Sequence, residues 1–110
     1  MLELAKKIKD IIDDKKGEDI TIIDISEKSG FADFFVNATA TNERMLDAII
    51  GEIDKKLHAE HDLLPKGIEG RPSSGWLLMD YGDIIINIFL PEQRQTYNID
   101  KIWSDGILVD

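Results

Sequence analysis

Cysteine is absent from this chain of 110 residues. Without a thiol the chain can form neither a disulfide framework nor a thiolate metal site, and it suits a reducing compartment. No apolar run approaches the length of about 20 residues that a membrane-spanning helix needs. The N-terminal segment 1–16 also lacks the uninterrupted apolar core of a secretory signal. We therefore expect a cytoplasmic protein with no membrane partner.

Basic residues are few, with 13 Lys and Arg against 22 Asp and Glu, and the formal net charge is −9. An acidic chain is repelled by phosphate backbones, and its scattered basic residues form no stripe interleaved with aromatic ones. We expect no direct nucleic-acid specificity. Such a chain is attracted instead to basic protein surfaces, although the same charge also serves simple solubility.

The chain has 43% hydrophobic and 32% charged residues, which is typical of a globular protein and not of a disordered one. Its length fits a single domain over residues 1–110, and no repeat or linker divides it. The tail from Ile99 onward is expected to be loosely ordered, 104–110 above all, apart from Ile102 and Trp103, whose side chains can pack. Residue periodicity predicts helices over 3–14, 42–60 and 91–97, the second capped by Thr41, and strands over 20–25, 34–40, 65–69, 76–80 and 84–89.

The order αββαβββα predicts an α/β (α+β) fold, with a single mixed five-stranded sheet and three helices. The strand at 76–80 is apolar on both faces, with Trp76 and Leu78 on one and Leu77 and Met79 on the other. Such a strand needs cover on both faces. Either the helices divide between the faces, or an uncovered part serves a partner or self-association. Trp76 itself suits a core or a binding hot spot.

Catalytic patterns are scarce, because the chain has no cysteine and no serine in a G-x-S-x-G elbow. His58 and His61 can share a helix face, but zinc usually needs a third ligand, and imidazoles at a helix end more often cap carbonyls or are solvated. Asp80 and Asp83, with Asp24 as a third candidate, could hold Mg²⁺ for phosphoryl or nucleotidyl transfer, but no phosphate-binding glycine motif accompanies them. We favour the alternative that Asp80 and Asp83 flank a hairpin turn. We therefore expect no catalytic residue, metal or cofactor.

The residues from Gly67 onward form an ordered set of motifs. Gly67-Ile68-Glu69-Gly70 is followed after five residues by Trp76 and then by Asp80-Tyr81-Gly82-Asp83. With the segments around them, these motifs resemble the ribosomal silencing factor (Iojap) family over residues 3–104. The other matching segments are Lys16-Gly17-Glu18-Asp19, Ala32-Asp33-Phe34-Phe35-Val36, Thr39-Ala40-Thr41, Arg44, Arg94, Tyr97 and Ile102-Trp103.

The sequence departs from the family pattern at two places. Met45 stands where the family often carries histidine, and the tail Ser104 to Asp110 extends past the usual end. The resemblance implies a sheet related in shape to the nucleotidyltransferases, without their catalytic Gly-Ser motif, which is missing here too. It also implies binding to the large ribosomal subunit through its fourteenth ribosomal protein, a basic partner, and a homodimer when the chain is isolated.

The function implied by this resemblance is translational repression, in which the bound protein sterically blocks association with the small subunit. We hypothesise that Trp76 and Leu78 supply an apolar anchor, while Glu69, Asp80 and Asp83 supply complementary charge. One alternative is a Mg²⁺-dependent nucleotidyl- or phosphoryl-transfer enzyme that uses Asp80 and Asp83. Another is a homodimeric scaffold that does not contact the ribosome.

Overall fold

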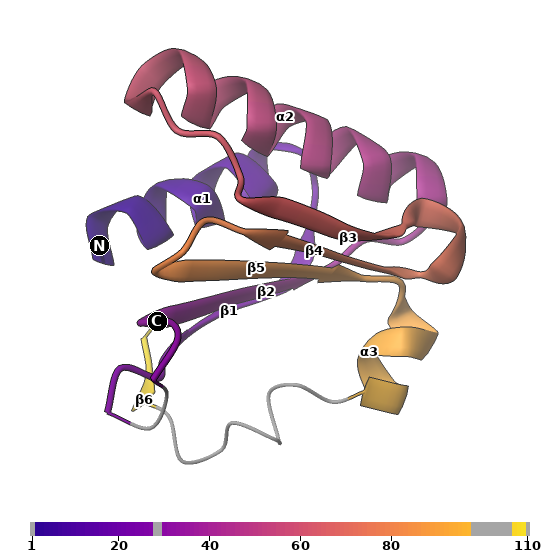
Figure 1. Ribbon diagram of the computed structural model, residues 1–110. Helices are drawn as coiled ribbons and strands as arrows, with labels where there is room; N and C mark the ends of the chain where they lie inside the picture. The colour runs from indigo at the N-terminus through magenta and orange to yellow at the C-terminus, as the bar shows by residue number, and fades with distance from the viewer. Residues whose placement is uncertain (1, 28–29, 98–106, 110) are drawn as a thin grey trace.

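A computed structural model describes residues 2–27, 30–97 and 107–109. They form one mixed sheet with the strand order β3-β4-β5-β2-β1-β6, in which only β2 and β5 are parallel neighbours (Figure 1). None of the helices described is both long and apolar enough to cross a membrane. The elements are α1 (Leu2–Asp14), β1 (Glu18–Asp24), β2 (Phe34–Thr39), α2 (Glu43–His61), β3 (Gly67–Arg71), a 3-10 turn (Pro72–Ser74), β4 (Trp76–Asp80), β5 (Ile84–Phe89), α3 (Pro91–Tyr97) and β6 (Ile107–Leu108).

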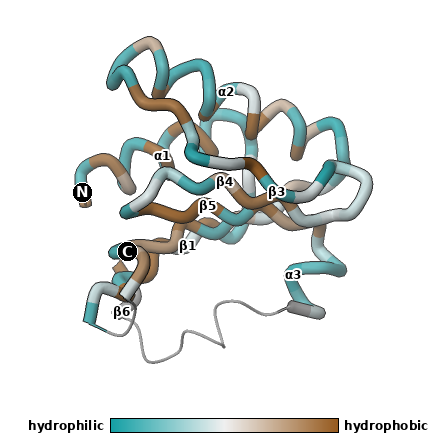
Figure 2. The backbone as a smooth tube through the Cα atoms, in the orientation of Figure 1, coloured by the Kyte–Doolittle hydropathy of each residue, from teal (hydrophilic) through white to brown (hydrophobic). Residues whose placement is uncertain are grey.

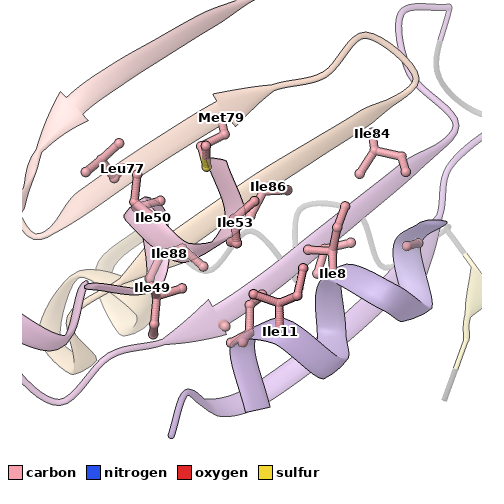
Figure 3. Close-up of a cluster of buried hydrophobic side chains, with 14 of the residues drawn as sticks. Ile8, Ile11, Ile49, Ile50, Ile53, Leu77, Met79, Ile84, Ile86 and Ile88 are labelled. Carbon is pink, nitrogen blue, oxygen red and sulfur yellow. The ribbon is translucent and has the colours of Figure 1, made fainter. Parts of the chain in front are cut away.

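Both long helices lie on the same face of the sheet, and α3 lies on the other side at one end (Figure 1). In Figure 2 the central strand β5 is mainly brown, for hydrophobic residues, whereas α2 alternates between teal and brown as an amphipathic helix does. The main core fills the space between the two helices and the sheet (Figure 3). Its labelled side chains come from α1 (Ile8, Ile11), α2 (Ile49, Ile50, Ile53), β4 (Leu77, Met79) and β5 (Ile84, Ile86, Ile88).

The predicted fold class is confirmed, and most element bounds differ from the prediction by one or two residues. The strand expected at 65–69 instead covers Gly67–Arg71. The reason is the register with β4, in which Gly67 lies opposite Asp80 and Arg71 opposite Trp76. The 3-10 turn then connects the two strands directly, so the loop expected over 70–75 is shorter than predicted.

A sixth strand, β6, lies in the tail that was expected to be loosely ordered. Ile107 and Leu108 pair antiparallel with Asp24 and Ile23 of β1, and the N–H of Val109 donates to the carbonyl oxygen of Ile22 at 2.7 Å. Without β6, β1 would be an edge strand with unpaired backbone groups, which an apolar Ile-Leu-Val segment can satisfy. The expected packing of Ile102 and Trp103 falls outside the described residues.

The N-terminal cap of α2 is Asn42, not Thr41 as predicted. The Asn42 side-chain oxygen accepts a hydrogen bond from the Met45 N–H at 2.8 Å, and the backbone of Asn42 is extended. The hydroxyl of Thr41 instead lies 3.6 Å from the sulfur of Met45. Asn and Thr both suit this position, so composition alone could not choose between two adjacent candidates.

We predict that Asn42→Ala lowers the free energy of unfolding by about 1 kcal/mol, because an N–H of the first turn loses its acceptor. The matched control, Thr41→Ala, should change it by less than about 0.5 kcal/mol. Urea unfolding followed by circular dichroism measures both. Equal effects of the two substitutions would contradict the assignment of the cap.

Candidate protein-binding surface

The face of the sheet opposite α1 and α2 is here called the open face. Side chains alternate along a strand, so the residues next to core positions point to this face. In β4 the core positions are Leu77 and Met79, and both are buried. Trp76 and Leu78 therefore lie on the open face, where they are only partly buried. The prediction that β4 is apolar on both faces is confirmed. Of the two alternatives for its cover, the long helices do not divide between the faces, since both lie on one (Figure 1).

A second, smaller core lies on the open face toward the β1 side of the sheet. It contains five buried residues, and Leu78 packs against it as a partly buried neighbour. Leu78 is therefore in contact with buried apolar residues on the open face. Its buried members are Ile23, Ile25, Ala32, Phe35 and Ile85.

A hollow of about 260 Å³ opens beside β3 and β4. Trp76 and Leu78 supply its apolar part, and Glu69 supplies the one carboxylate among its described lining residues. Gly70 and Ser74 complete the lining. Three of the five residues predicted for partner binding therefore line one hollow, because Glu69 lies directly opposite Leu78 in the β3–β4 pairing.

The shape of the β3–β4 hairpin depends on Gly70. Its φ is +91°, in a region that favours glycine, and a Cβ placed on it would collide with the carbonyl oxygen of Trp76. The turn beyond it is held by Ser74, whose hydroxyl donates to the Arg71 carbonyl oxygen at 2.7 Å and accepts from the Arg71 N–H at 3.3 Å. These local contacts fix where Trp76 begins β4.

Trp76 is fixed by two further contacts. Its ring stacks on Phe89 of β5, with the centroids 5.3 Å apart and the planes inclined by 27°. Its indole N–H donates to the side-chain oxygen of Asn87 at 3.0 Å. Trp76 is therefore only partly a core residue, since one part of it packs on the sheet while another lines the hollow.

Asp80 and Asp83 do not line this hollow. The carboxylate of Asp80 accepts the Gly82 N–H at 2.7 Å, and the Tyr81 N–H donates to the Ile84 carbonyl oxygen at 2.9 Å, which closes the β4–β5 turn. Asp83 is exposed, and its carbonyl oxygen accepts from the N–H groups of Asp33 and Phe34. The favoured alternative, that both aspartates flank a hairpin turn, is confirmed.

The metal candidates are not assembled into a site. Asp24 lies on β1, which β2 and β5 separate from β4 in the sheet. Its carboxylate accepts from the Ser26 hydroxyl and N–H, and these hydrogen bonds lower the pKa of Asp24. His58 and His61 are exposed near the end of α2. No group of three potential metal-binding side chains occurs within residues 2–27, 30–97 and 107–109.

Arg94 links α3 to the ends of β1 and β2. Its guanidinium donates to the carbonyl oxygen of Asp19 at 2.7 Å and to the hydroxyl of Thr39 at 3.1 Å. The N–H of Arg94 also donates to the Leu90 carbonyl oxygen at 3.0 Å within the first turn of α3. Arg94, one of the motif residues, therefore anchors the helix on the open face.

Two buried residues, Asn37 and Asn87, were missed as candidate site residues. Each is a single amide in an otherwise largely apolar strand, FFVNAT for β2 and IIINIF for β5. They lie opposite each other in the parallel β2–β5 register. A lone Asn in the middle of a buried strand was the available signal, because a buried amide needs partners.

Tyr81 in the β4–β5 turn gives a pH-dependent prediction. Its hydroxyl oxygen is buried, and none of the described residues hydrogen-bonds to it. Burial, with a smaller contribution from the negative charge of Asp54, raises the pKa of Tyr81 to about 12 from its ordinary value of 10.0. The folded state therefore keeps this proton at a pH where the unfolded chain loses it, so stability falls as the pH rises from about 10 to 12.

We predict that Tyr81→Phe reduces this alkaline loss of stability. At pH 7 the substitution should leave the free energy of unfolding unchanged, or raise it by up to about 1 kcal/mol, because no hydrogen bond is lost. Urea unfolding at pH 7 and across the alkaline range measures both effects, with Tyr97→Phe as the control. An unchanged alkaline slope in Tyr81→Phe would contradict the role of Tyr81.

Comparison with known proteins finds a matching family, related sequences and a similar solved structure. The family model described as "Ribosomal silencing factor during starvation" matches residues 1–110. A ribosomal silencing factor of Zymomonas mobilis is 36% identical over 103 residues, which cover 94% of this chain and 77% of that protein. The mouse (Mus musculus) protein named "Mitochondrial assembly of ribosomal large subunit protein 1" is 32% identical over 93 residues, or 82% of this chain and 40% of its own length. A crystal structure of a Chromobacterium violaceum protein matches with a TM-score of 0.88 at 30% identity, covering 94% of this chain and 86% of that one.

Proposed function

Because the chain belongs to the family of ribosomal silencing factors, we propose that it is a translational repressor that binds the large ribosomal subunit. The contact is made with the fourteenth ribosomal protein of that subunit, a basic partner. The bound chain occupies surface that the small subunit must touch, and so it blocks subunit association. The name of the mouse relative, which refers to assembly of the large ribosomal subunit, supports a partner on that subunit.

The observation that carries this proposal is the hollow beside β3 and β4. Trp76 and Leu78 present apolar surface there although the protein has a complete core elsewhere. Tryptophan is enriched among residues that dominate binding energies, because it buries a large and stiff apolar area. We propose Trp76 and Leu78 as the apolar anchor of the interface.

Charge supports a basic partner. The chain carries a net charge of −9, and Glu69 lies at the hollow itself. Asp80 and Asp83, at the β4–β5 turn, add carboxylates that a partner larger than the hollow can reach. Complementary charge speeds association and helps to select the partner. We propose these three acids as the charged part of the interface.

The proposed mechanism needs no turnover. A domain that blocks a surface acts in proportion to its occupancy, which is set by affinity and concentration. We therefore propose that the chain is a binding protein and not an enzyme. A cytoplasmic location and a homodimer in the free state complete the proposal, and both rest on the family resemblance.

The enzyme alternative is not favoured by any observed contact. It requires Asp80 and Asp83 to hold Mg²⁺, but the carboxylate of Asp80 already accepts a hydrogen bond from the turn. A rise in melting temperature that needs both Mg²⁺ and a nucleotide, and is lost in Asp80→Asn, would favour this alternative over the binding function.

We predict that Trp76→Ala weakens binding to purified large subunits by more than about 1 kcal/mol, or about fivefold in Kd. The loss follows from removal of the largest apolar side chain in the hollow. Co-sedimentation at several protein concentrations measures the affinity, and circular dichroism checks that the variant is folded.

The matched control is Leu64→Ala. Leu64 is also a large exposed apolar residue, with 64% of its surface accessible, but it lies in the connection between α2 and β3 and does not line the hollow. Its substitution should leave Kd within about twofold, as expected for a residue outside the hot spot. A folded Trp76→Ala protein with unchanged affinity would rule out the anchor.

A further inference from the structure

Two asparagines lie at the centre of the sheet with almost no accessible surface. Asn37 of β2 is 0% exposed and Asn87 of β5 is 1% exposed. Their strand neighbours Val36, Ala38, Ile86 and Ile88 are all buried apolar residues. A buried amide is costly unless its hydrogen bonds are made, so these positions call for a physical reason.

The hydrogen bonds of the two amides form a ladder across three strands. The indole N–H of Trp76 donates to Oδ1 of Asn87 at 3.0 Å. Nδ2 of Asn87 in turn donates to Oδ1 of Asn37, also at 3.0 Å. The strands run β4, β5, β2, so the ladder joins the middle of the sheet to the hollow.

The direction of the ladder is determined from its Trp76 end. An indole N–H can only donate, so Asn87 must turn its oxygen toward β4. Its amide nitrogen then faces β2, and Asn37 must present its own oxygen as the acceptor. Each amide orientation therefore depends on the next, and the whole arrangement follows from one donor on Trp76.

We infer that Asn87, supported by Asn37, is a positioning residue that holds the Trp76 indole in its partner-binding orientation. This inference rests on the proposed function, in which Trp76 is the anchor. Stacking on Phe89 restrains the plane of the ring, whereas the hydrogen bond restrains which edge of the indole faces the sheet. A side chain that is ordered before binding loses less conformational entropy when the partner arrives.

The face of the sheet on which the two amides lie supports a role in positioning Trp76. The core between the sheet and the long helices contains no buried polar residue within the described ranges. Asn37 and Asn87 lie in the alternate positions that face the open side, as does Thr39. The buried amides thus occur on the face that carries Trp76, where an apolar residue at position 87 would leave the indole N–H without this acceptor.

The first experiment measures hydrogen exchange of the Trp76 indole N–H by NMR in the full chain, with Trp76→Phe to assign the signal. We expect exchange at least about tenfold slower than for a solvent-exposed indole, since the hydrogen bond must open first. Exchange at the exposed rate would overturn the inference. This measurement needs no core substitution, so it stands even if an asparagine variant does not fold.

The second experiment compares Asn87→Leu with Ile86→Val. Ile86 is the adjacent residue of β5, but it is in the core on the opposite face. Asn87→Leu should accelerate exchange of the indole N–H and raise Kd for large subunits by about fivefold or more. Ile86→Val, which removes one buried methyl group, should lower stability without either effect.

The outcomes separate this inference from the proposed function. If Asn87→Leu frees the indole but leaves Kd unchanged while Trp76→Ala weakens binding, the positioning role is wrong and the anchor stands. If neither variant changes Kd, the anchor itself is wrong.

Asn37→Ala provides a third variant, in which Asn87 loses its support but keeps its contact with Trp76. It should show a smaller change in both measurements, and no change in either would remove Asn37 from the inference.

Discussion

The placement of both long helices on one face of the sheet is the constraint on which the rest depends. Every strand at the centre of the sheet has a second face, and those second faces carry Trp76, Leu78 and Phe35. Only the short α3, among the described helices, lies on that side (Figure 1). The apolar surface near β4 is therefore not covered by α1 or α2, which pack on the main core of the opposite face.

Features that depend on the pattern within one segment could be predicted from the sequence, whereas features that depend on the pairing of two segments could not. The alternation of Trp76, Leu77, Leu78 and Met79 predicted their faces, because the side-chain period of a strand is fixed. The bounds of β3 depended instead on pairing with β4, and β6 on the free edge of β1. Both depend on the pairing of one strand with another, which the periodicity of a single segment does not contain.

The candidate site was predicted in part for similar reasons. Glu69, Trp76 and Leu78 meet at one hollow because the β3–β4 register brings them together. The position of Asp80 beside a turn could be predicted, because aspartate commonly accepts a hydrogen bond from the backbone N–H two residues further along, as it does here from Gly82. The hairpin of β4 and β5 was predicted, but linking Asn87 to Trp76 also required the register, in which Asn87 lies opposite Leu78, and the orientation of the indole ring. The hydrogen bonds of Asn87 connect Asn37, at the buried centre of the sheet, to Trp76, the proposed anchor.

The central claim, steric blockade of subunit joining, is tested most directly by mixing purified large and small subunits and measuring the joined fraction by sucrose-gradient sedimentation. The account predicts that this fraction falls as the protein is added in excess over large subunits, with the protein migrating in the large-subunit peak. An unchanged fraction of joined subunits, at concentrations where the large subunit is saturated with the protein, would contradict it.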